Sequence, residues 1–81
     1  MEKNLIIKST SGLHAALAAK VVQVASRFDV DIKLVYEHVT IDAKSILSLM
    51  SLAVPKGKNV KLVASGTNAE AAIACIVKII G

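Results

Sequence analysis

Aromatic residues are nearly missing from this chain: they make up 2% of its 81 residues, and tryptophan is absent. Because 54% of the residues are hydrophobic all the same, the core must be built from Ala, Val, Ile and Leu. The shortage of rings also argues against single-stranded nucleic acid as a partner, since such binding relies on bases stacked on aromatic side chains. The ten Lys and Arg residues are scattered and leave a net charge of +4, so solvated surface charge explains them better than a nucleic-acid interface.

Cysteine is almost as scarce, and long apolar runs are absent. Cys75 is the only cysteine, which excludes an intramolecular disulfide and a cysteine-based metal cluster, and its apolar neighbours favour a packing role. No apolar run approaches the roughly 20 residues of a membrane-spanning helix, and no charged-then-apolar signal peptide opens the chain. We therefore expect one domain over residues 1–81, in the cytoplasm and without membrane insertion.

Hydrophobic spacing divides the chain into seven elements, in the order strand, helix, strand, strand, helix, strand, helix. A short run of branched apolar residues between lysines predicts the first strand, and period-2 alternation predicts the later ones. Apolar residues at i, i+3, i+4 and i+7 predict the helices. An antiparallel sheet with the helices on one face suits that order, which indicates the α+β class. The expected elements cover residues 3–8, 15–28, 30–37, 39–41, 45–52, 60–65 and 69–80.

Individual residues predict the ends and the inner faces of these elements. Asp29 should end the first helix, and a turn near Glu37–His38 should place His38 in the left-handed conformation. Ser45 should cap the second helix, and Thr67 with Glu70 fits a capping box before the third. The inner face of the first helix is expected at Ala15, Ala18, Ala19, Val22, Ala25 and Phe28, and that of the third at Ala69, Ala72, Ile73, Ile76 and Ile80.

The stretch 11–19, Ser-Gly-Leu-His-Ala-Ala-Leu-Ala-Ala, joins a polar break to the start of the first helix. Its position puts His14 at or next to the helix N-terminus, where unpartnered backbone N–H groups and the positive end of the helix dipole favour anions such as phosphate. The same field disfavours an imidazolium, so the ring should stay neutral and able to act as a nucleophile. A plain surface or capping histidine is the competing interpretation of the spacing alone.

Two segments resemble the HPr family, the histidine-containing phosphocarriers of the bacterial sugar phosphotransferase system. Gly12-Leu13-His14-Ala15 is similar to the phosphorylation-site motif of the family, and residues 43–52, around Ser45, are similar to its regulatory serine region. The likeness extends over about residues 2–80. It implies an open-faced β-sandwich, with a four-stranded antiparallel sheet and three helices on one face, in the order βαββαβα.

The resemblance also implies an activity. His14 would accept a phosphoryl group from enzyme I of the phosphotransferase system and pass it to a sugar-specific enzyme II component, as a carrier and not as an independent enzyme. The backbone N–H groups of Ala15, Ala16 and Leu17 would bind the transferred oxygens. No metal and no organic cofactor is indicated. The expected partner-binding residues are Leu17, Lys20, Lys44, Ile46, Leu47 and Met50.

The chain departs from the family motif directly after Ala15. The motif continues with arginine and then proline, whereas this chain has Ala16 and Leu17. The missing charge-assisted contacts of a guanidinium should cost roughly 1.5–3 kcal/mol, or one to two decades in rate, which slows the transfer without abolishing it. Lys20 and Lys44 are the candidates to compensate, and Leu17 should enlarge the apolar surface beside His14.

A second hypothesis is a regulatory paralogue that does not carry phosphate. It would bind partners through the helix that begins at Ser45, with phosphorylation of Ser45 as the switch, and HPr kinase/phosphorylase and a transcriptional regulator would be its partners. A third hypothesis is a small α+β domain with an unrelated role, such as binding a small ligand. In the helix that begins at Ser45, Leu49 and Leu52 are assigned to the core, and the exposed partner contacts would be Ile46, Leu47 and Met50.

Overall fold

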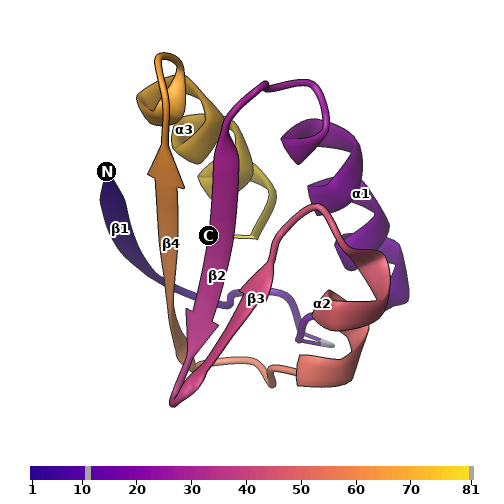
Figure 1. Cartoon of the computed structure of the whole chain (residues 1–81). Helices are drawn as coiled ribbons and strands as arrows, with labels where there is room; N and C mark the ends of the chain where they lie inside the picture. Colours follow the sequence, from indigo (N-terminus) through magenta and orange to yellow (C-terminus); the bar gives the residue numbers. More distant parts are fainter. Residues whose placement is uncertain (11, 81) are drawn as a thin grey trace.

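Four strands and three helices follow one another in the order that the hydrophobic spacing predicts (Figure 1). The computed structural model describes residues 1–10 and 12–80, so Ser11 of the predicted polar break lies outside the described residues. The elements are β1 (Glu2–Ile6), α1 (Ala15–Ala25), β2 (Asp31–Tyr36), β3 (Val39–Asp42), α2 (Ile46–Leu52), β4 (Asn59–Ser65) and α3 (Ala69–Ile80).

The strands form one antiparallel sheet in the order β1-β4-β2-β3. Inward side chains lie opposite one another across the strands, with Leu5 opposite Val60 and Leu34 opposite Leu62, and none of the four is more than 8% exposed. The three helices cover this face of the sheet and leave the other face open (Figure 1). The predicted α+β open-faced sandwich is therefore confirmed.

The helices fill the core with small and branched side chains. The inner face predicted for α3 is confirmed in full, whereas that of α1 is partly wrong, because Ala15 and Ala19 are exposed and Leu17 and Val21 are buried. Alanine occupies every side of α1, so the spacing of its alanines does not identify the face that packs. The buried residues of the three helices are Leu17, Ala18, Val21 and Ala25 in α1, Leu49 in α2, and Ala69, Ala72, Ile73, Ile76 and Ile80 in α3.

The first helix ends at Ala25, three residues before the predicted end at Phe28. The N–H groups of Arg27 and Phe28 donate to the carbonyls of Val24 and Ala25 over 3.1 and 3.2 Å. These i→i−3 bonds tighten the last turn and take the chain out of the α-helix before the predicted breaking residue. The Lys44 ammonium then donates to the Phe28 carbonyl over 2.8 Å, so a cation satisfies the negative end of this segment.

Two predicted features, the left-handed residue of the hairpin and the cap of α3, lie one residue away from their predicted positions. In the β2–β3 hairpin the left-handed residue is Glu37, with φ of 56°, and not His38. α3 begins after Asn68, whose carbonyl accepts the first bond of the helix over 3.0 Å. The capping box of Thr67 and Glu70 is therefore wrong, and neither side chain makes a hydrogen bond within residues 1–10 and 12–80.

A testable consequence concerns the end of α2, where Ala53 adopts a left-handed conformation with φ of 48° and ψ of 46°. A side chain with a Cβ atom costs about 1 kcal/mol in this conformation, and glycine does not. We expect Ala53→Gly to raise the free energy of unfolding by about 0.5–1 kcal/mol in urea titrations. The matched control is Ala19→Gly, an exposed position inside α1, which should lower it by about 1 kcal/mol; equal losses in both variants would contradict the expectation.

Candidate functional site

His14 is the N-cap residue of α1, as the sequence predicts. Its backbone is extended, with φ of −90° and ψ of 176°, and its carbonyl accepts the Ala18 N–H over 2.8 Å. Its Nδ1 atom accepts a hydrogen bond from the Leu17 N–H over 3.4 Å. The imidazole thus satisfies one of the free donors at the helix start, in the way that a Ser or Asp side chain usually does.

This contact assigns the state of the ring. An Nδ1 atom that accepts a hydrogen bond carries a lone pair, so the proton of the neutral imidazole belongs on Nε2. His14 is exposed, and the N–H groups of Ala15 and Ala16 have no carbonyl to bind within the helix. A nucleophilic lone pair and free backbone donors therefore occupy the same exposed end of α1.

The loop before His14 is fixed against the connection between α2 and β4. Leu13 is buried, and its N–H donates to the Val54 carbonyl over 2.8 Å. Gly12 has a positive φ of 69°, and a Cβ atom on it would lie 2.4 Å from the Val54 oxygen and 3.0 Å from Pro55 Cα. Only glycine lets the two segments approach this closely, so these contacts determine where the His14 backbone starts.

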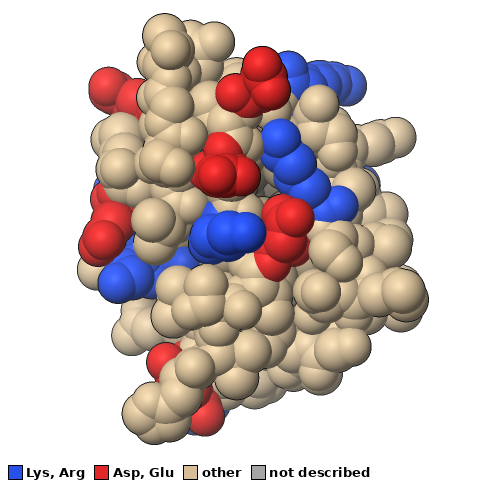
Figure 2. All heavy atoms as spheres, viewed as in Figure 1, with Lys and Arg blue, Asp and Glu red and all other residues tan. Residues whose placement is uncertain are grey.

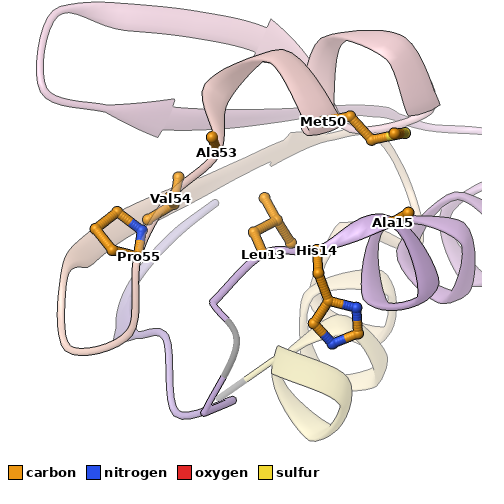
Figure 3. A pocket seen from close by; sticks show the side chains of 7 residues that line it. All are labelled: Leu13, His14, Ala15, Met50, Ala53, Val54 and Pro55. Carbon is orange, nitrogen blue, oxygen red and sulfur yellow. The ribbon is translucent and has the colours of Figure 1, made fainter.

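A hollow of about 360 Å³ lies between this loop and the end of α2. In Figure 3 the His14 ring extends away from Met50 and Ala53, on the far side of the loop from them. The ring is thus left open to a partner. The residues that line the hollow are Leu13, His14, Ala15, Met50, Ala53, Val54 and Pro55.

The surface over α2 is free of charge. Figure 2 shows charged side chains over the strands and none at the lower right of the view, where α2 lies in Figure 1. Ile46, Leu47 and Met50 are 39%, 75% and 44% exposed, while Leu49 is fully buried and Leu52 half-buried. Exposed apolar side chains grouped in this way are typical of a protein-binding surface. Their role as partner contacts agrees with this exposure and stays a prediction.

The two predicted phosphorylation sites are the N-cap residues of two different helices. Ser45 is the N-cap of α2, where its Oγ accepts the Ser48 N–H over 3.3 Å, and the adjoining Lys44 is bonded to the chain just beyond the end of α1. His14 stands at the start of α1. α2 runs between the two sites in space, because it begins after Ser45 and ends at the hollow beside His14.

Two of the predicted site residues have other surroundings than expected. Leu17 is 8% exposed and belongs to the core, so the predictions that it contacts partners and enlarges the apolar surface beside His14 are wrong. Lys44 donates to the Phe28 carbonyl, far from His14, so it does not compensate for the missing arginine there. Lys20 is exposed on α1.

Sequence reasoning missed the residues that hold the loop in place. Val54 and Pro55 carry no chemical signal, and nothing in the spacing joins them to residues more than 40 positions earlier. The one available signal was Gly12, because glycine directly before a helix start often marks a close backbone approach. Across the described ranges 1–10 and 12–80, no group of three or more His, Cys, Asp or Glu residues is placed to hold a metal ion, and no helix is long and apolar enough to cross a membrane.

Comparison with known proteins gives consistent matches over the chain. The family model described as "PTS HPr component phosphorylation site" matches residues 1–81. The phosphocarrier protein HPr of Treponema pallidum is 39% identical over 74 residues, which are 91% of this chain and 84% of that protein. The crystal structure of HPr from Bacillus anthracis superposes with a TM-score of 0.95 at 33% identity, over 100% of this chain and 96% of the other. The solution structure of Crh, the catabolite repression HPr of Bacillus subtilis, gives 0.72 at 35% identity, over 99% and 95%.

The contact between Gly12 and Val54 yields a testable prediction. Gly12→Ala adds a Cβ atom against a backbone oxygen in a left-handed conformation, so we expect the free energy of unfolding to fall by about 2–3 kcal/mol. Gly57→Ala is the control, because Gly57 also has a positive φ, of 88°, but nothing lies within 4 Å of its added Cβ atom; it should cost about 1 kcal/mol. Urea titrations measure both values, and equal losses would refute the role given to the close approach.

Proposed function

The chain belongs to the HPr family of the phosphotransferase system, and from this premise we propose that it carries a phosphoryl group on Nδ1 of His14. The observation that supports this atom is the hydrogen bond from the Leu17 N–H to Nδ1. It implies a lone pair on Nδ1 that faces the free donors of the helix start. A phosphoryl group attached there would meet those donors with its oxygens.

The transfer requires little from the protein beyond position and charge. The Nδ1 lone pair forms the nitrogen–phosphorus bond while the bond from phosphorus to the phosphorylated donor breaks, and its electron pair stays on the donor. The ring keeps its Nε2 proton throughout, so no separate base is needed. The reverse exchange on an acceptor protein returns the imidazole to its starting state. His14 thus holds the phosphoryl group only between the donor and the acceptor, as a carrier does.

Backbone donors are the main source of charge stabilisation in this proposal. The N–H groups of Ala15 and Ala16 are oriented by α1 before any phosphate arrives, so they cost little reorganisation during the reaction. The Leu17 N–H exchanges its bond to Nδ1 for a bond to a phosphoryl oxygen. Ala16 offers no side-chain donor. We therefore expect transfer slower than in relatives that carry arginine at this position, in proportion to the roughly 1.5–3 kcal/mol of a charge-assisted hydrogen bond.

Interaction with proteins of the phosphotransferase system follows from family membership. We propose enzyme I as the donor and sugar-specific enzyme II components as acceptors. The docking surface would be the uncharged apolar group of Ile46, Leu47 and Met50, because it ends at the hollow beside His14. A partner that covers this surface and extends past the loop would exclude water from the ring, which strengthens each contact to the phosphoryl group.

Incubation with phosphoenolpyruvate and enzyme I tests the proposal. The wild-type protein should acquire acid-labile phosphate at His14, read by mass spectrometry of the intact chain and its peptides. His14→Asn should acquire none, yet keep its stability within about 0.5 kcal/mol, because asparagine is a good N-cap. His38→Asn is the matched control, since His38 is exposed at the hairpin, and it should label as the wild type does. No label on the wild type after long incubation would refute the proposal.

A regulatory role is the second candidate function, and two observations favour it. Ser45 caps α2 and adjoins the exposed Ile46 and Leu47, and the structural match to Crh of Bacillus subtilis is to a catabolite repression HPr. Addition of about −2 charge to Ser45 suits the start of a helix and alters the adjacent apolar surface. The partners would be an HPr kinase/phosphorylase and a transcriptional regulator. This role is compatible with transfer at His14.

Treatment with HPr kinase and ATP tests the second role. We expect one acid-stable phosphate on Ser45 and none on Ser45→Ala, because only the cap hydroxyl lies where a phosphate gains from the helix start. Ser51→Ala is the matched control in the same helix, where the Ser51 hydroxyl donates to the Leu47 carbonyl over 2.8 Å, and it should be labelled normally. Intact-mass measurement gives the stoichiometry. An unmodified wild type, or equal labelling of Ser45→Ala, would rule out Ser45 as the switch.

A further inference from the structure

Lys20 lies on α1 one turn beyond the backbone donors at the helix start. It stands four residues after Ala16 and three after Leu17, the spacings that make side chains neighbours on a helix surface. The Cα–Cβ bonds of a helix tilt toward its N-terminus, and long side chains extend over the preceding turn. The Lys20 side chain can therefore extend toward the free N–H groups and the His14 ring.

The surface between Lys20 and His14 is made of alanines. Ala15, Ala16 and Ala19 are all exposed, and none has an atom beyond Cβ to block the path. A flexible four-carbon lysine stem can lie across such a surface and keep its charged end in water. The replacement of a motif arginine by Ala16 thus removes a guanidinium and also clears the space that it would fill.

No acidic group competes for the Lys20 ammonium. Among residues 1–10 and 12–80 the one ion pair joins Lys61 to Glu2, and the one lysine ammonium that donates a hydrogen bond is that of Lys44. The first turn of α1 contains no acidic residue, and the sequence has none between Glu2 and Asp29. The charge of Lys20 is available to an arriving anion.

We propose that Lys20 binds the phosphoryl oxygens of phosphorylated His14 and supplies the positive charge that Ala16 does not. The inference rests on the proposed function and adds a residue to it. A phosphoryl group on Nδ1 adds roughly two negative charges at the start of α1. The ammonium of Lys20 binds its oxygens from the second turn of the helix, and the backbone N–H groups bind them from the first turn. The contact is stronger in the phosphorylated state, so it favours acceptance of the group.

Initial rates of transfer from phosphorylated enzyme I measure this contribution. We expect Lys20→Gln to lower kcat roughly three- to tenfold, in the range of a charge-assisted contact weakened by solvent. Lys20→Arg should stay near the wild-type rate. Arg27→Gln is the matched control, because it removes the same charge just beyond the other end of α1, and it should stay near the wild type as well. The ³¹P shift of the phosphohistidine should move in Lys20→Gln and not in Arg27→Gln.

The variant Ala16→Arg sharpens the test by restoring a guanidinium beside His14. In that background Lys20→Gln should slow transfer less than twofold, since the arginine already binds the same oxygens. Three results would overturn the proposal for Lys20 while His14 is still phosphorylated. They are an equal loss of transfer rate from Lys20→Gln in both backgrounds, a rise in KM with an unchanged kcat and ³¹P shift, and an equal loss of rate in Arg27→Gln. A wild type that takes no phosphate overturns the proposed function itself, so the two failures are distinct.

Discussion

The hydrogen bond from the Leu13 N–H to the Val54 carbonyl is the contact on which the site depends. It joins the loop before α1 to the chain after α2, and it is possible only because Gly12 has no Cβ atom to meet the Val54 oxygen. Leu13 is anchored in the core next to it, so the following residue has little freedom. The exposed ring of His14 is thus presented from a backbone that is held on both sides, which is the preorganisation that phosphoryl transfer needs.

α2 gives the fold a surface that touches both candidate sites. Its short length leaves one fully buried side chain, Leu49, and turns Leu47 and Met50 outward. Its start is capped by Ser45 and its end adjoins the hollow beside His14. In the proposed functions, a partner docked on α2 would therefore lie beside Ser45 and beside the hollow that His14 lines, so a charge placed on Ser45 would alter its binding without any change of the helix itself. This coupling through a shared surface needs no movement of the fold.

The fold was predictable because β2 and β4 alternate between buried and more exposed residues and α3 buries one face, so period and polarity agree over these elements. His14 was predictable as an N-cap for the same local reason. The misplaced features have other causes. The buried face of α1 was predicted wrongly because alanines lie on all sides of this helix. Leu17 was assigned to the surface, but its side chain is buried in the core. The Gly12–Val54 approach and the Lys44–Phe28 bond join distant residues, and no local pattern encodes such contacts.

The two departures from the family motif act in opposite directions on the anion site. Ala16 removes a side-chain cation, whereas Leu17 restores a backbone N–H that a proline in its place would lack. That N–H is the one that donates to Nδ1 of His14, so in this chain it orients the ring, and in the proposed transfer it would bind a phosphoryl oxygen afterwards. Its side chain is buried, which fixes the direction of the donor. In the proposed transfer the site would therefore rely on main-chain dipoles more than the motif does, and it would require a more distant cation only for the charge that dipoles cannot supply.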